Sequence, residues 1–281
     1  MTTAHYLRPT RLEEALSALG AGPRVILAGG TDYYPSRVGR PLNDHVLDIT
    51  AISALRAVRH ENGYWRIPAL VTWSDILANA RLPSMFDALK LAAREIGGAQ
   101  IQNMGTVCGN ICNASPAADG MPVLLALDAE VELASHKGVR RMQLADFVIG
   151  NRRTARAPNE LMTAILVRDF ADPARSTFLK LGARRYLVIS IAMVAIVLSL
   201  SSNGHIASAA VAVGACSPAA KRLSGLEAAL LGEPLRAELA DRVSAEHLGP
   251  LSPIDDIRGT ATYRADAVLT LIRRAIVDLC R

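Results

Sequence analysis

The chain has 281 residues, of which 51% are apolar, 20% are charged and 4% are aromatic. This length allows two or three domains of roughly 100–150 residues and a large core, so the composition excludes a disordered chain. The net charge of +5 comes from 31 basic and 26 acidic residues that are spread along the sequence. A nucleic-acid-binding protein usually concentrates basic residues and stacking aromatics, so we predict no nucleic-acid partner.

Cysteine usage and apolar runs indicate the compartment. The four cysteines, Cys108, Cys112, Cys216 and Cys280, are too few for a fold built on disulfides. The first ten residues contain no apolar run of the kind found in signal peptides. The most apolar run covers residues 186–200 and is shorter than the ~20 residues of a spanning helix, and its Val and Ile content favours a buried strand. We therefore predict a cytoplasmic protein with no membrane contact.

Short strands alternate with short helices over the first 170 residues. Thr10 is predicted to cap a helix that ends at Gly20, with Glu13 as its reciprocal partner. The other predicted elements are strands at residues 24–28, 46–49, 65–67 and 130–133, and helices at residues 73–79, 84–96 and 122–127. Such alternation is typical of an α+β domain or of two lobes that mix helices and strands.

A polar, proline-bearing stretch at residues 169–173 separates this part from a different pattern, and we predict domains at residues 1–171 and 172–281. Asn203 and Gly204 stand between two β-prone runs, which is a strong signal for a hairpin. Two amphipathic helices are predicted near residues 225–231 and 260–279. We expect an α+β domain with an antiparallel hairpin sheet and packed helices.

Two glycine-bearing segments suggest chemistry. They are residues 26–33, Ile-Leu-Ala-Gly-Gly-Thr-Asp-Tyr, and residues 103–119. Glycine lets a backbone approach a ligand closely, and successive N–H groups in such loops bind anions. With the hydroxyls of Thr31, Thr106 and Ser115, both segments together are predicted to bind a diphosphate-containing ligand. Ordinary glycine turns are the alternative. No Gly-x-Gly-x-x-Gly fingerprint and no P-loop is present, which argues against Rossmann or P-loop binding of NAD or ATP.

The same segments resemble the FAD-binding medium subunit of molybdenum hydroxylases, the family of xanthine dehydrogenase and carbon monoxide dehydrogenase. The resemblance extends over nearly the whole chain, through residues 28–32, 98–110, 113–119, 150–154, 178–185 and 212–218. It implies a two-lobed FAD-binding domain of the vanillyl-alcohol-oxidase-like type, followed by the C-terminal α+β domain found in the flavoproteins of this family.

The resemblance also implies site residues for FAD. Residues 26–33 are expected around the diphosphate and ribose, residues 106–110 on the opposing wall, Asp119 on polar groups, Ile96 and Leu161 on apolar parts, and Lys180 near the flavin. The expected FAD-binding residues are Ile26, Leu27, Ala28, Gly29, Gly30, Thr31, Asp32, Tyr33, Ile96, Thr106, Val107, Cys108, Gly109, Asn110, Ser115, Asp119, Leu161 and Lys180. A solvated surface cation is the alternative for Lys180.

In function, the resemblance implies an oxidoreductase subunit that relays electrons from iron–sulfur clusters through FAD to an acceptor such as NAD. The implied partners are a large subunit with a molybdenum cofactor and a small subunit with two-iron-two-sulfur clusters, assembled as a dimer of heterotrimers. We predict no catalytic side chain and no metal ligand in this chain. A free-standing flavin reductase or oxidase and a flavin-free scaffold subunit are the alternatives.

Cys108 is the departure that motivates the scaffold alternative. Family members usually read Thr-x-Gly-Gly-Asn where this chain has Thr106-Val-Cys-Gly-Asn110, and a cysteine is strained at a position that needs positive φ. A metal site of Cys108 and Cys112 with His60 or His136 is an alternative that the sequence disfavours, because no second cysteine pair is present. The basic run of Arg152, Arg153 and Arg156 is interpreted as a solvated face or a docking surface.

Overall fold

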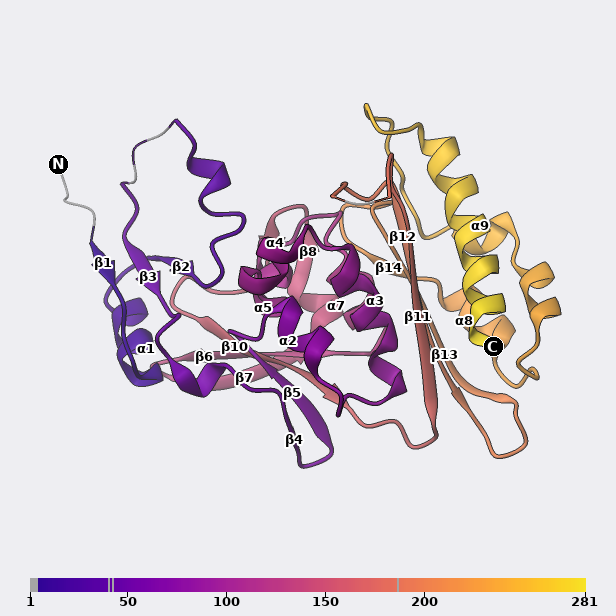
Figure 1. The fold of residues 1–281 in the computed structure, drawn as a ribbon, viewed down its shortest axis with the longest axis horizontal. Helices are drawn as coiled ribbons and strands as arrows, with labels where there is room; N and C mark the ends of the chain where they lie inside the picture. The colour runs from indigo at the N-terminus through magenta and orange to yellow at the C-terminus, as the bar shows by residue number, and fades with distance from the viewer. Residues whose placement is uncertain (1–4, 40, 42, 186) are drawn as a thin grey trace.

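The computed structural model describes residues 5–39, 41, 43–185 and 187–281. Figure 1 shows successive layers, from a small N-terminal lobe, through a central sheet and its helices, to a C-terminal sheet covered by a long helix. The prediction of mixed helices and sheets is confirmed. Among the described residues, no helix combines the length and the apolar character needed to span a lipid bilayer.

The N-terminal lobe is a three-stranded parallel sheet in the order β1–β3–β2, with one helix beside it. Its elements are β1 (Tyr6–Leu7), α1 (Leu12–Gly20), β2 (Val25–Leu27) and β3 (Val46–Asp48). Helix α1 buries Ala15 and Leu19, which lie on one face because they are four residues apart. Strand β2 leads directly into Gly29 and Gly30.

The capping box predicted at the start of α1 is wrong. The helix begins at Leu12 with Arg11 at the cap position, and the Arg11 side chain accepts no capping hydrogen bond. Instead, the backbone N–H of Thr10 donates to Glu14 Oε2 at 3.2 Å. Because the helix starts one residue later than predicted, Glu14 rather than Glu13 lies three residues after the cap position.

The second lobe is built on a five-stranded antiparallel sheet in the order β4–β5–β10–β6–β7. Its strands are β4 (Arg59–Glu61), β5 (Tyr64–Pro68), β6 (Glu130–Ser135), β7 (Gly138–Gln143) and β10 (Leu161–Arg168), with the two-stranded pair β8 (Val148–Gly150) and β9 (Arg153–Thr154). Its helices are α2 (Trp73–Ala78), α3 (Asp87–Glu95), α4 (Ala99–Met104), α5 (Val107–Asn113), α6 (Gly120–Ala126) and α7 (Leu144–Phe147). The predicted helix at residues 84–96 begins as a short 3-10 turn, Ser84–Phe86, that continues into α3.

The C-terminal part is an antiparallel sheet in the order β11–β12–β13–β14 with two helices. Its elements are β11 (Ala174–Leu181), β12 (Ala192–Leu200), β13 (Ile206–Gly214), β14 (Lys221–Arg222), α8 (Ser224–Leu230) and α9 (Ala261–Leu279). The hairpin predicted at Asn203 and Gly204 is confirmed, since it joins β12 to β13. The buried strand predicted within residues 186–200 is confirmed from Ala192 onward, and Tyr186 lies outside the described residues.

Strand β12 is buried on both faces, which explains its continuous apolar sequence. Met193, Ala195 and Val197 belong to the core that is shared with the second lobe. The alternate residues Val194, Ile196 and Leu198 belong to a second core, which α9 covers. Helices α3 and α6 both contact the C-terminal sheet. Figure 1 shows α3 on one side of that sheet and α9 on the other. This layered contact fixes the C-terminal sheet against the lobe that carries α3 and α6.

Candidate functional site

The two glycine-bearing segments meet in space. The Cβ of a side chain placed at Gly29 would lie 1.9 Å from the carbonyl oxygen of Met104. One at Gly105 would lie 3.4 Å from Thr31 Oγ1. The segment after β2 therefore rests against the turn between α4 and α5, at a distance that only glycine permits. A cavity of about 490 Å³ opens between them.

The first wall of this cavity, residues 26–33, is the continuation of β2. Gly30 has a φ of +71°, a left-handed conformation that glycine adopts without strain. Its carbonyl accepts a hydrogen bond from the Tyr34 N–H at 3.1 Å, which turns the chain sharply. Tyr33 lines the cavity, and its hydroxyl lies 3.1 Å from Asp44 Oδ2. This turn presents the backbone of residues 28–31 to the cavity.

The second wall, residues 106–110, is the start of α5. Thr106 caps the helix, because its hydroxyl accepts a hydrogen bond from the Gly109 N–H at 3.0 Å. Asn110 lies one turn further and lines the cavity. Its Oδ1 is buried and has no hydrogen-bond partner in the described part of the chain. A buried unpaired acceptor is costly, so this atom is suited to a donor from a ligand.

Cys108 is not strained. It lies inside α5 and is absent from the described residues that have positive φ. Its Sγ lies 3.6 Å from the carbonyl oxygen of Ile67, and burial raises the pKa of its thiol well above the usual value. The expectation of strain at this position is therefore wrong, because the helix continues through it. Within residues 5–39, 41, 43–185 and 187–281, no group of three or more His, Cys, Asp or Glu side chains is arranged to hold a metal ion.

Most of the predicted FAD-binding residues line one cavity. These are Ile26, Leu27, Ala28, Gly29, Gly30, Thr31, Asp32, Tyr33, Ile96, Thr106, Cys108, Gly109, Asn110 and Leu161. Four others do not line it: Val107, Ser115, Asp119 and Lys180. Val107 points into the core, and Ser115 accepts a hydrogen bond from the Ala117 N–H at 3.3 Å.

Asp119 and Lys180 form a buried ion pair behind the cavity wall. Lys180 Nζ lies 2.7 Å from Asp119 Oδ2, and the two side chains are 5% and 7% exposed. Ser190 donates its hydroxyl to the other carboxylate oxygen, and Lys180 also donates to the Glu95 carbonyl, next to the cavity residue Ile96. Burial raises the pKa of Asp119, while Lys180 and Ser190 oppose that rise. The alternative interpretation of Lys180 as a surface cation is wrong.

The structure adds cavity residues that the sequence reasoning missed. Arg152, Thr154 and Arg156 line the cavity beside Cys112 and Met162. Two arginines of the basic run thus face the cavity, where a run of charges in the sequence favoured a solvated face. The basic run itself was the signal in the sequence, because a group of cations before the last strand of the lobe can face an anionic ligand as readily as it can face water.

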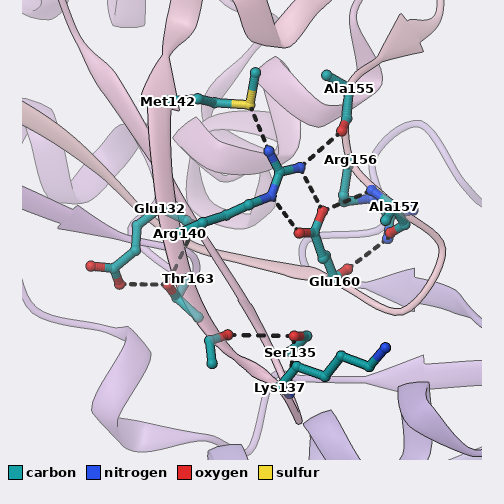
Figure 2. A network of polar contacts seen from close by, with 11 residues as sticks. Glu132, Ser135, Lys137, Arg140, Met142, Ala155, Arg156, Ala157, Glu160 and Thr163 are labelled. Carbon is teal, nitrogen blue, oxygen red and sulfur yellow. Dashed lines mark hydrogen bonds and ion pairs between the residues drawn. The ribbon is translucent and has the colours of Figure 1, made fainter.

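A polar network holds the loop that follows β9 and carries Arg156 (Figure 2). Arg140 on β7 donates to both carboxylate oxygens of Glu160, at 2.6 and 2.9 Å, and to the Ala155 carbonyl at 3.1 Å. Glu160 also accepts from the Ala157 N–H at 2.8 Å, and Arg156 donates to the Glu160 carbonyl at 2.7 Å. The bidentate pair therefore fixes the shape of residues 155–160.

A Glu160→Gln variant is expected to be about 2 kcal/mol less stable at neutral pH, since the side chain loses its charge and the new NH2 group cannot accept a hydrogen bond from Arg140 or Ala157. The hydrogen bonds from Arg140 hold the pKa of Glu160 below its ordinary value. A depressed native pKa stabilises the fold above the unfolded pKa, and this stabilisation is lost as pH falls through the native pKa. Denaturant unfolding at several pH values should therefore show that the difference in unfolding free energy between the wild type and Glu160→Gln becomes smaller below about pH 4. Glu13→Gln, the same change at an exposed position, is the control and should show no loss of stability. A loss in Glu160→Gln that does not change with pH would contradict a stabilising role of the charged Arg140–Glu160 pair.

Comparisons with known proteins agree with this geometry. The family model "FAD binding domain in molybdopterin dehydrogenase" matches residues 2–167, and "CO dehydrogenase flavoprotein C-terminal domain" matches residues 177–279. The chain is 32% identical to the glyceraldehyde dehydrogenase medium chain of Sulfolobus acidocaldarius, over 98% of this chain and 97% of that one. It is 30% identical to the nicotinate dehydrogenase FAD-subunit of Eubacterium barkeri, over 99% and 97%.

Solved structures show the same fold. The reconstituted CO dehydrogenase from Oligotropha carboxidovorans matches with a TM-score of 0.89 at 26% identity, over 98% of this chain and 96% of that one. The fold and the cavity thus define a flavoprotein component of an oxidoreductase. The chain belongs to the family of FAD-binding medium subunits of molybdenum hydroxylases, and its cofactor is FAD.

The cavity residues fit this cofactor. A volume of about 490 Å³ lies within the range of roughly 300–1,000 Å³ for small-molecule sites. The unpaired Asn110 Oδ1 can accept a hydrogen bond from a donor group of FAD. The first wall offers backbone N–H groups, and Arg152 and Arg156 add positive charge for a diphosphate.

Proposed function

We propose that this chain relays electrons from iron–sulfur clusters through FAD to an acceptor such as NAD. The observation that carries the proposal is the cavity between the two glycine-bearing walls, in a chain that matches FAD-binding medium subunits over 95% or more of its length. FAD supplies the electron-transfer chemistry when it is bound, and the protein supplies binding, orientation and electrostatics.

The proposal assigns each part of the cavity a role. Residues 26–33 bind the diphosphate and the adjoining ribose, and residues 106–110 bind from the opposite side. Ile96 and Leu161 pack on apolar parts of FAD. Asp119 and Lys180 lie behind the part of the cavity that Ile96 lines, because Lys180 donates to the carbonyl of the preceding residue, Glu95. We assign this pair to the flavin end of FAD, where the Lys180 ammonium stabilises negative charge on the reduced ring.

We further propose the assembly and the domain organisation predicted from the sequence. The partners are a molybdenum-cofactor large subunit and a small subunit with two-iron-two-sulfur clusters, in a dimer of heterotrimers. Relatives described as medium chains or medium subunits support such partners. The chain divides near residue 171, between the end of β10 and the start of β11, and the first domain is of the vanillyl-alcohol-oxidase-like type. The cytoplasmic location stays a prediction.

The free-standing and scaffold alternatives have less support. The scaffold hypothesis rested on strain at Cys108, and Cys108 is helical and unstrained. A free-standing reductase predicts turnover by this chain alone, whereas the subunit hypothesis predicts turnover only together with its partners.

Co-expression with the partner genes tests the proposal. We expect a yellow complex in which substrate bleaches the flavin absorbance, and in which NAD⁺ restores that absorbance. The isolated chain should hold FAD but should not be reduced by the substrate. Substrate reduction of the isolated chain, or a purified complex without flavin, would overturn the proposal. Restoration by artificial dyes but not by NAD⁺ would overturn only the assignment of the acceptor.

A further inference from the structure

Arg152 links the first wall of the cavity to the end of α5. It lies in the turn between β8 and β9, and its guanidinium Nη1 lies 3.7 Å from Asp32 Oδ1 on the first wall. The same nitrogen donates to Asn113 Oδ1 at the end of α5. Both carboxylate and amide belong to residues that line the cavity, as does Arg152 itself. A single side chain therefore touches the N-terminal lobe and the second lobe where they meet.

The backbone of Arg152 is held in an unusual conformation. Its φ is +57°, in the left-handed region that non-glycine residues rarely adopt. Its N–H donates to the Ala114 carbonyl at 2.8 Å, which fixes the turn to the end of α5. Strained residues that are held by their surroundings are concentrated at ligand-binding sites. In this conformation the side chain lines the cavity and contacts Asp32.

The Arg152–Asp32 ion pair does not by itself account for this arrangement. The two side chains are 56% and 60% exposed, and exposed ion pairs contribute little to stability. A guanidinium at the opening is more useful toward an anion inside the cavity. The diphosphate is the anionic part of FAD, and the first wall offers it backbone N–H groups and the Thr31 hydroxyl, together with the opposing negative charge of Asp32.

Arg156 is the other lining cation, but its Nη1 is already engaged by backbone carbonyls. Its Nη1 donates to the Ala157 and Glu160 carbonyls, at 3.2 and 2.7 Å. Arg152, in contrast, lies beside Asp32. Asp32 itself is two residues after the left-handed turn at Gly30. Of these two cations, Arg152 is thus the one that contacts the first wall, where the diphosphate is expected.

We propose that Arg152 binds the diphosphate of FAD across the junction of the two lobes, with Asp32 and Asn113 orienting its guanidinium. A planar guanidinium forms paired hydrogen bonds with phosphate oxygens, and it adds the positive charge that backbone amides lack. This inference rests on the proposed position of FAD between the two walls. It makes Arg152 a binding residue that also joins the lobes around the cofactor.

Titration of FAD into the flavin-stripped full chain tests this role, with flavin fluorescence as the readout. We expect Arg152→Gln to bind FAD about tenfold more weakly at low salt, which is about 1.4 kcal/mol. Because salt screens charge–charge attraction, the difference from the wild type should shrink at high ionic strength. Arg152→Asn should behave alike, and it controls for the backbone since asparagine tolerates positive φ. Arg153→Gln, the same charge change one residue away and outside the cavity lining, should bind like the wild type.

Two results would overturn the proposal. One is equal FAD affinity in the Arg152→Gln and Arg153→Gln chains; the other is a loss of affinity that does not change with salt. The thermal melting temperature of each flavin-stripped variant should match the wild type, because the ion pair is exposed. Gly29→Ala distinguishes a failure of the proposed FAD position from a failure of the role given to Arg152. If it retains FAD, the position of FAD is wrong; if it loses FAD while Arg152→Gln does not, only the role of Arg152 fails.

Discussion

A Gly29→Ala variant is expected to lose most of its FAD. The added methyl group would lie 1.9 Å from the Met104 carbonyl oxygen and 3.0 Å from Gly105 Cα, both of which are rigid backbone atoms. The first wall must therefore move away from the turn between α4 and α5, and overpacking of this kind costs about 1–3 kcal/mol. The flavin absorbance per polypeptide after purification measures the retained cofactor. We expect the dissociation constant of FAD to rise roughly tenfold or more, since each 1.4 kcal/mol changes it tenfold, and the retained flavin to fall as a result.

Gly22→Ala is the matched control. No atom lies within 4 Å of a Cβ built at Gly22, and its φ is not in the left-handed region. The same methyl addition should therefore leave both the flavin content and the melting temperature unchanged. Wild-type flavin content in Gly29→Ala would show that FAD binding does not need the close approach of the two walls, and it would contradict the proposed position of FAD between them.

A Lys180→Met variant is expected to be strongly destabilised. It leaves the Asp119 carboxylate buried with Ser190 as its remaining side-chain partner. Removing one member of a buried ion pair costs about 3–5 kcal/mol, because the other charge stays desolvated. Denaturant unfolding of the full chain measures this loss. Lys221→Met, at the exposed position of β14, is the matched control and should have little effect.

The pH dependence of Lys180→Met follows from Asp119. Burial raises the pKa of this carboxyl, and without the ammonium that rise is opposed only by Ser190. An acid whose native pKa exceeds its unfolded pKa stabilises the fold at low pH and loses that contribution as pH rises. The loss of unfolding free energy in Lys180→Met, relative to the wild type, should therefore be larger at about pH 8 than at about pH 5. The double variant Asp119→Asn with Lys180→Met should recover much of the stability; no recovery would contradict the ion-pair explanation.

Local signals in the sequence predicted most of the elements and part of the site. Asn203-Gly204 predicted the hairpin of β12 and β13, because that dipeptide favours the required turn wherever it stands between strands. The glycine-bearing segments predicted the two walls, because close backbone approach requires residues without side chains. The predicted Thr10 cap was wrong, because two successive residues could begin the same helix and local preference hardly separates them.

The relations between distant segments were decided by the tertiary structure. Asp119 and Lys180 are 61 positions apart, and only packing of the β11–β12 sheet against α3 and α6 makes them a buried pair. Arg152 belongs to a basic run that is typical of a solvated face, and its side chain is exposed, but the turn between β8 and β9 also places it against Asp32 at the cavity. The sequence by itself thus determined which segments can approach a ligand, since that depends on residue type. Which charges face that ligand was set by the fold, because the position of a side chain depends on long-range packing that no local pattern encodes.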